Sequence, residues 1–435
     1  MTDLLFVNAA QIVTCAGAPR ARKGSEMREA GILRNSAVAV SEGRIAMIGA
    51  ARDLQHAYAD AEVVDCRGGV LTPGLVDSHT HAVFGKPRFE EHEQRAEGLD
   101  YMEIASRGGG IHASVRDFRE RAEQELYDLA VARVRDLMSY GTTTLEIKSG
   151  YGLSVEDELK ALRVIGRLAE RFPLRIVATW MGAHEIPHDY RTGDGRRAEY
   201  LEMLIGELLP RVVAQGIARF ADVFCEPGVF TVDETRRILQ AAKRAGLGVK
   251  LHADELKPAG GAELAAELEA TSADHLAAIS EKGIAALASS RTVATLLPGT
   301  MLFLGKAKQA PARALIDAGG AVALATDFNP GTSPTVNFPL MLTLGVSQLR
   351  MSLAEALIAV TVNGAAALGL AGETGQIAPG FSADLALFAI GDIRELPYWY
   401  GARLCVGTWR AGAPCHPYEN LGMLNARPPE VVPAG

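Results

Sequence analysis

The stretch GLVDSHTH, residues 74–81, decides how this chain is interpreted, because it joins a buried-strand pattern to two closely spaced histidines. Side chains two positions apart on a strand point to the same face, so His79 and His81 can both face one ion. Short motifs of this kind also occur as polar loops, so the interpretation needs support from elsewhere in the chain.

From about Thr72 onward, apolar strand patterns alternate with long helical patterns. Amphipathic patterns over 125–140, 155–172 and 232–246 have the i, i+3, i+4 spacing of helices with one buried face. Parallel strands need crossover helices, so this alternation predicts an α/β fold with a (β/α)8 TIM-type barrel. The expected strands lie within 74–81, 141–149, 174–184, 219–226, 248–255, 271–276, 291–299 and 321–330.

Both ends of the chain have a different pattern, with short β-rich runs punctuated by Gly, Asn and Asp. We expect them to pair into one small composite β-sandwich outside the barrel. The predicted boundaries are 1–71 and 371–435 for the two parts of the sandwich, and 72–370 for the barrel. The Pro-rich segment 426–435 is predicted to be a loose terminus.

Composition limits the classes of function. The chain has 435 residues, 48% of them hydrophobic, and a net charge of -8, which allows a large core and argues against nucleic acid or anionic membrane as a partner. Its five cysteines lack metal-knuckle or redox spacing, so we expect reduced thiols. We see neither a signal peptide nor an apolar run of about 20 residues, so a soluble, cytoplasmic protein is expected.

Two more predicted strand ends strengthen the metal interpretation. His252 ends the fifth strand and Asp327 ends the eighth, and barrel enzymes build their sites at these ends. Three imidazoles and one carboxylate suit one divalent metal, Zn2+ or iron as Fe2+ or Fe3+, with a position left open for water. The sequence therefore predicts a site formed by His79, His81, His252 and Asp327.

Three residues are candidates for catalysis at this site. Glu255 follows His252 by three residues and can move protons to a leaving nitrogen. Asp327 is both a ligand and a possible acceptor of the water's proton. His275, at the end of the sixth strand, can polarise a scissile carbonyl, although a hydrogen-bonded core histidine is the alternative. The division of proton transfers among the three stays open.

The motifs taken together resemble a known family. These motifs are PGLVDSHTHAVFG, LHADE, SADHL, ATDFNPGTSP, YMEIASRGGGIHASV and MGAHEIPHDYR. They resemble the amidohydrolases and, within them, the imidazolonepropionase family. The resemblance covers nearly the whole chain. It implies hydrolysis of the cyclic amide of 4-imidazolone-5-propanoate to N-formimidoyl-L-glutamate, the third step of histidine degradation, by a homodimer.

The resemblance also implies which residues contact the substrate. They are Arg88, Tyr151, His184 and Glu255, with Asn329, Gly331 and Thr332 in the loop that contacts the product. A guanidinium is a natural fork for a propanoate carboxylate, although an Arg in a charged stretch is more often solvated. The family more often has FGGSR where this chain has FGKPR, so Pro87 can alter the approach of Arg88.

Other interpretations remain open. A mononuclear deaminase would use the same His252, Glu255 and Asp327, but it would release ammonia and would not need Arg88. A non-catalytic barrel is expected to have lost ligands that this chain keeps. The fourth strand supplies Cys225 and Glu226 but no lysine, so one metal is predicted, with Glu226 as the candidate ligand for a second. Lys148 is expected to have a packing or salt-bridge role.

Overall fold

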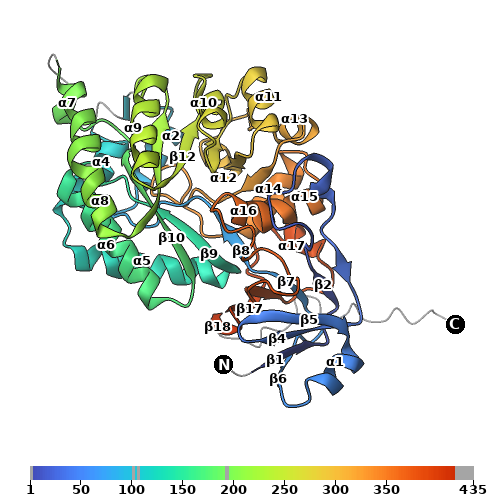
Figure 1. The fold of residues 1–435 in the computed structure, drawn as a ribbon. Coiled ribbons are helices and arrows are strands. Elements are labelled where there is room, and N and C mark those ends of the chain that lie inside the picture. Colours follow the sequence, from blue (N-terminus) through green and yellow to red (C-terminus); the bar gives the residue numbers. More distant parts are fainter. Residues whose placement is uncertain (1–2, 100–102, 105–107, 192–194, 417–435) are drawn as a thin grey trace.

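The computed structural model describes residues 3–99, 103–104, 108–191 and 195–416, and a barrel of eight parallel strands forms its centre (Figure 1). The strands are neighbours in chain order, and each overlaps one predicted segment, so the predicted barrel is confirmed. They are β8 (Leu75–Asp77), β9 (Thr142–Lys148), β10 (Arg175–Ala183), β11 (Ala218–Cys225), β12 (Gly248–Ala253), β13 (Ser272–His275), β14 (Val293–Leu296) and β15 (Val322–Leu324).

The barrel closes where the first and last strands meet. The segments beyond β8 and β15 form a parallel bridge between Thr80 and Phe328. The amide of Asp327 donates to the carbonyl of His79 (3.0 Å), and the amide of His81 donates to the carbonyl of Phe328 (2.8 Å). The closure of the barrel thus places His79 and His81 next to Asp327.

Helices cover the outside of the barrel (Figure 1). The three helices predicted from amphipathic spacing are observed as α5 (Glu123–Ser139), α6 (Val155–Arg171) and α9 (Val232–Arg244). Sequence signals fix two of their starts, because Ser154 Oγ caps α6 and Thr231 forms a capping box with Glu234 in α9.

The remaining helices are shorter. They are α1 (Ala51–Ala57), α2 (Phe89–Ala96), α4 (Ile111–Glu120), α7 (Arg196–Glu202), α8 (Leu209–Gln215), α10 (Gly261–Glu267), α11 (Glu281–Ser289), α12 (Pro298–Phe303), α13 (Ala312–Asp317), α14 (Pro339–Ser347), α15 (Leu353–Val360), α16 (Val362–Ala366) and α17 (Glu395–Tyr398). The 3-10 helices η1 (Gly24–Arg28) and η2 (His188–Tyr190) and the π-helical turn η3 (Met203–Leu208) complete the set described.

The two ends of the chain form one β-sandwich beside the barrel, as predicted (Figure 1). One sheet has the order β5-β4-β1-β6, and the other has the order β18-β17-β16-β7-β2-β3. Their bounds are β1 (Leu4–Val7), β2 (Gln11–Val13), β3 (Ile32–Leu33), β4 (Ser36–Ser41), β5 (Arg44–Ala50), β6 (Glu62–Asp65), β7 (Val70–Pro73), β16 (Leu385–Phe388), β17 (Cys405–Arg410) and β18 (Ala413–His416). The rings of Phe6 and Trp409 meet edge to face at 4.9 Å, so the ends share one core.

Three further predictions concern membrane spans, the cysteines and the segment at 426–435. Within the residues that the structure describes, no helix has the length and apolar character needed to cross a membrane. All five cysteines are free. The predicted loose terminus, 426–435, lies outside the described residues, as do 101–102 and 105–107 of the motif at 101–115.

Candidate active site

The four predicted metal ligands converge at the carboxyl end of the barrel strands. Ligand atoms of His79, His81 and His252 all lie within 4.8 Å of one another. Asp327 Oδ1 lies 3.5 Å from His79 Nε2 and 3.8 Å from His81 Nε2. The strand β8 ends at Asp77, so the histidine pair lies on the segment just beyond the ladder rather than within it.

The hydrogen bonds of these histidines fit a metal ion. His79 Nδ1 lies 2.7 Å from Asp274 Oδ2, and His252 Nδ1 lies 3.0 Å from Asp222 Oδ1. A carboxylate fixes the Nδ1–H tautomer, which leaves Nε2 with a free lone pair. The Nε2 atoms of His79 and His252 are buried and have no hydrogen-bond partner in the protein. The site therefore presents buried acceptors that a divalent cation would satisfy.

Electrostatics favour the neutral, ligating form of the imidazoles. Burial, followed by the nearby positive charge of Lys148, lowers the pKa of His79 well below its ordinary value. Burial, followed by the effect of the neighbouring histidines, also lowers the pKa of His81. Neutral imidazole is the form that binds metals.

Asp327 is held in an unusual backbone conformation. Its φ of +52° lies in the left-handed region, which a non-glycine residue seldom adopts without compensation. Thr300 Oγ1 donates to Asp327 Oδ2 (2.6 Å), and the side-chain amide of Asn329 donates to the Asp327 carbonyl (2.6 Å). Oδ1 is thereby left to face the histidines. Burial raises the pKa of Asp327 to about 6.

Glu255 and His275 lie side by side next to the histidine cluster. His275 Nδ1 is 3.5 Å from Glu255 Oε2, and the His275 ring lies 5.0 Å from that of His252. Burial, followed by the charge of Asp327, raises the pKa of Glu255 to about 8. A carboxyl group with such a pKa can both accept and donate a proton near neutral pH. Asp254 accepts four backbone amides at the start of α10 and fixes the turn that carries Glu255.

Two aromatic side chains flank the cluster on the other side. The ring of His184 stacks on that of His81 with centroids 4.9 Å apart and an angle of 18°. Tyr151 lies 6.0 Å from His81 and 5.6 Å from His184. Burial lowers the pKa of His184 to about 3, so its ring is neutral. The structure thus brings both predicted substrate contacts beside the predicted metal ligands.

Arg88 reaches the predicted product loop from the start of α2. Its backbone amide donates to the carbonyl of Pro330 (3.2 Å), and its Nε is buried without a hydrogen bond, 3.6 Å from Glu91 Oε2. The guanidinium lies directly over Gly331, where a Cβ atom would overlap it. Asn329 Oδ1 accepts the amides of Gly331 and Thr332 (2.8 Å each), which shapes the loop.

Several residues of the site escaped the sequence interpretation. Asp222 and Asp274 contact His252 and His79, two of the predicted metal ligands. They are charged residues inside buried strands, and this contrast is the signal from which the sequence could have revealed them. Thr300 carried no such signal. Glu226, the candidate for a second ion, accepts the amides of Leu256 (3.2 Å) and Lys257 (2.9 Å) instead. It belongs to none of the potential metal-binding groups found among the described residues.

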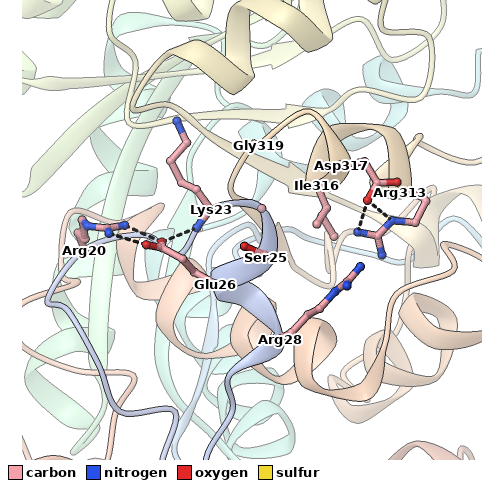
Figure 2. A pocket seen from close by; sticks show the side chains of 10 residues that line it. Arg20, Lys23, Ser25, Glu26, Arg28, Arg313, Ile316, Asp317 and Gly319 are labelled. Atoms are coloured by element: carbon pink, nitrogen blue, oxygen red, sulfur yellow. Dashed lines mark hydrogen bonds and ion pairs between the residues drawn. The ribbon is translucent and has the colours of Figure 1, made fainter.

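A surface cavity lies away from this site, between η1 and α13 (Figure 2). It measures about 750 Å3 and has a charged lining. Arg20 pairs with Glu26 at 2.7 Å, and Arg313 pairs with Asp317 at 2.9 Å. These charges therefore satisfy one another, and no predicted site residue lines the cavity.

Comparison with known proteins identifies the family to which the chain belongs. The model of the amidohydrolase family matches residues 92–416. An imidazolonepropionase from Symbiobacterium thermophilum is 47% identical over 403 residues, which is 92% of this chain and 94% of that protein. An imidazolonepropionase from Bacillus velezensis is 44% identical over 400 residues, 92% of this chain and 93% of that protein.

The chain belongs to the imidazolonepropionases of the amidohydrolase family. Solved structures of less similar proteins share its fold. A guanine deaminase from E. coli has a TM-score of 0.72 at 16% identity, covering 96% of this chain and 100% of that chain. An adenosine deaminase from Xanthomonas campestris with bound zinc has a TM-score of 0.70 at 20% identity, covering 96% and 93%. At such identities the likeness concerns the fold alone.

Proposed function

We infer that this chain hydrolyses the cyclic amide of 4-imidazolone-5-propanoate to N-formimidoyl-L-glutamate, the third step of histidine degradation. The observation that carries this inference is the identity of 47% to an imidazolonepropionase over 92% of this chain. The converging ligand set at the barrel mouth supports it, because ring opening by water needs an activated nucleophile.

We propose that His79, His81, His252 and Asp327 hold one divalent ion, zinc or iron. Bound there, such an ion supplies hydroxide near neutral pH, because coordination lowers the pKa of water from about 15.7 to about 7. The tautomers set by Asp274 and Asp222 support this assignment.

The substrate carboxylate is assigned to Arg88. Its guanidinium is nearly buried and has an unsatisfied Nε, and a carboxylate is the bidentate partner that such a group binds best. The amides of Gly331 and Thr332 are engaged by Asn329, so we give this loop the role of shaping the pocket around Arg88. Tyr151 and His184 form the wall against which the planar ring would lie.

Glu255 and His275 are assigned to proton transfer and carbonyl polarisation. His275 donates to the oxygen that becomes negative in the tetrahedral intermediate, which is the usual role of a positioned donor at an acyl centre. Glu255 delivers a proton from its carboxyl oxygen to the departing ring nitrogen, and the C–N bond then breaks. The pKa of about 8 gives Glu255 a proton to deliver at neutral pH.

The experiment that tests this function is an absorbance assay of freshly generated 4-imidazolone-5-propanoate with metal-loaded protein and a chelator-treated control. Rapid loss of the imidazolone without ammonia, abolished by the chelator, is the expected result. Ammonia release would instead assign the chain to the deaminases. No turnover with the loaded protein would refute the inference and withdraw the role of Arg88.

We also propose that the enzyme works as a homodimer on this small carboxylate substrate and has no nucleic-acid or membrane partner. The net charge of -8 supports the exclusion of polyanions. Sedimentation equilibrium would test the dimer, and a monomer at micromolar concentration would contradict it.

A further inference from the structure

Five charged side chains lie fully buried inside the barrel beneath the metal ligands, and the proposed reaction uses none of them directly. We call this group the buried charge cluster; it consists of Glu146, Lys148, Asp222, Lys250 and Asp274. Each side chain has 0% exposure. Burying charge is costly unless each charge meets partners, so the contacts within the cluster define what it does.

Lys148 is the centre of the buried charge cluster. Its Nζ lies 2.7 Å from Asp222 Oδ2, 3.0 Å from Glu146 Oε2 and 3.5 Å from Asp274 Oδ2. One ammonium group therefore contacts three carboxylates contributed by β9, β11 and β13.

Two of these carboxylates lead on to metal ligands. Asp222 uses its other oxygen, Oδ1, for His252, where it contacts both Nδ1 (3.0 Å) and the backbone amide (3.1 Å). Asp274 contacts His79 Nδ1 through Oδ2 (2.7 Å), and Ser272 Oγ donates to its Oδ1 (2.6 Å). Two continuous paths of polar contacts thus connect Lys148 with the proposed metal ligands His252 and His79, which lie on opposite strands.

We propose that Lys148 is a positioning residue of the metal centre, which holds His79 and His252 in their metal-binding tautomer and orientation through Asp274 and Asp222. Its ammonium also occupies the space among three carboxylates that a second cation would otherwise fill. The proposal rests on the proposed metal site, but not on which substrate that site takes.

The physical reason is the tautomer. A carboxylate oxygen held towards Nδ1 accepts a hydrogen bond from it, so Nδ1 carries the proton and Nε2 remains free for metal. Lys148 donates to Asp222 Oδ2, which fixes the rotation of that carboxylate and directs its Oδ1 to His252 Nδ1. Without Lys148, Asp222 and Asp274 would face each other's charge in a dry interior and would lose that order.

Lys250 provides a matched comparison within the same cluster. Its Nζ donates to Glu146 Oε2 (2.7 Å) and to the carbonyl of Ser78 (2.9 Å), and it lies 3.8 Å from Asp274. No ion pair joins it to Asp222 among the described residues. Removal of Lys250 therefore takes away an equally buried ammonium but leaves both Lys148 paths intact.

The test compares two double variants of the full-length protein, E146Q/K148M and E146Q/K250M. Each removes one buried negative and one buried positive charge, so the net charge of the cluster is unchanged. Zn2+ affinity is measured by competition with a chromophoric chelator, and the absorption spectrum of the Co2+-loaded protein reports ligand geometry. E146Q/K148M should bind Zn2+ about 10- to 100-fold more weakly with an altered Co2+ spectrum, and E146Q/K250M should stay within about threefold of wild type. Equal losses in both variants, or no loss in either, would overturn the proposal.

A more conservative variant tests the proposal if the two double variants do not fold. D222N keeps the size of the side chain. If the amide oxygen faces Lys148, the amide nitrogen faces His252 Nδ1 and forces the proton onto Nε2. Zn2+ affinity should again fall about 10- to 100-fold, and nitrogen NMR of the metal-free protein should report an Nε2–H tautomer at His252. Wild-type affinity in D222N contradicts the proposal. Because these readouts need no substrate, they stand even if the imidazolone assay fails.

Discussion

Substitution of Gly331 by alanine isolates the contact between the product loop and Arg88. A Cβ atom at this position would overlap the end of the guanidinium and lie 2.6 Å from its Nε, whereas ordinary contacts begin at 3.4 Å. Gly331 is not among the glycines with positive φ, so alanine brings no backbone strain. The guanidinium is the far end of a flexible side chain, so it moves away and the fold stays intact.

The structure sets the magnitude of the effect. The Nε atom must retreat by at least about 0.8 Å, and misplacement of a substrate-positioning group by about 1 Å can cost about 100-fold in rate. Loss of a charge-assisted hydrogen bond, about 1.5–3 kcal/mol, corresponds to about 10- to 150-fold. We therefore expect kcat/KM for 4-imidazolone-5-propanoate to fall about 10- to 150-fold, mostly through KM, with metal content and Tm near those of wild type.

Two controls make the result interpretable. Gly372 has no atom within 4 Å of a built Cβ and no positive φ, so G372A should keep wild-type kinetics. The double variant G331A/R88A should be little worse than R88A alone, because both remove the same contact. Activity of G331A within twofold of wild type, or full additivity with R88A, would refute the assignment of the carboxylate to Arg88.

The other predictions concern catalysis, metal and acid stability. E255Q should lower kcat about 10²- to 10⁴-fold without changing metal content, measured by steady-state kinetics and elemental analysis; full activity would remove Glu255 from proton transfer. Chelation of the metal should lower Tm by several degrees in calorimetry, because an ion that binds only the folded state stabilises it; an unchanged Tm would contradict an ion bound at the proposed site. Glu355 is buried, which opposes its ionisation, but hydrogen bonds from Arg313, the Ser352 amide and Arg28 lower its pKa from 4.5 to about 2. A depressed pKa stabilises the fold above pH 4.5, by at most about 3 kcal/mol, and this is lost as the pH falls towards 2. The difference in the free energy of unfolding between wild type and E355Q, measured in urea, should therefore shrink between pH 6 and pH 3. A constant difference would refute the lowered pKa of Glu355.

Sequence patterns were sufficient for the barrel and for the position of the ligands, because strand order and strand direction follow from βα alternation. His252 and Asp327 could be assigned to one rim without knowing any contact between them. The amphipathic spacing over 232–246 predicted α9 within two residues of its observed end, and Thr231 and Glu234 form a capping box at its start. The strands were predicted too long: β15 covers only Val322–Leu324, since the chain leaves the ladder before Asp327.

The contacts around the ligands could not be predicted, for a physical reason. Asp274 on β13 meets His79 beyond β8, and these strands are not neighbours in the sheet. Such a contact depends on barrel diameter and strand stagger, which no local pattern contains. Lys148 was expected to have a packing or salt-bridge role, and it forms ion pairs. Glu146 lies two residues away on the same strand, but Asp222 on β11 and Asp274 on β13 are brought to Lys148 only by the barrel.

The composite sandwich imposes an order on synthesis. Strand β7 lies between β2 and β16, and Pro73 of β7 pairs with Leu385, about 310 residues later. At roughly 5–20 residues per second, the ribosome needs about 15–60 s to supply that partner. Throughout this interval β7 has an unpaired edge on the nascent chain, and such an edge can recruit strands from other molecules. Strand β16 therefore protects the edge of β7, so chains that terminate before β16 are expected to aggregate even though the whole barrel sequence has been made.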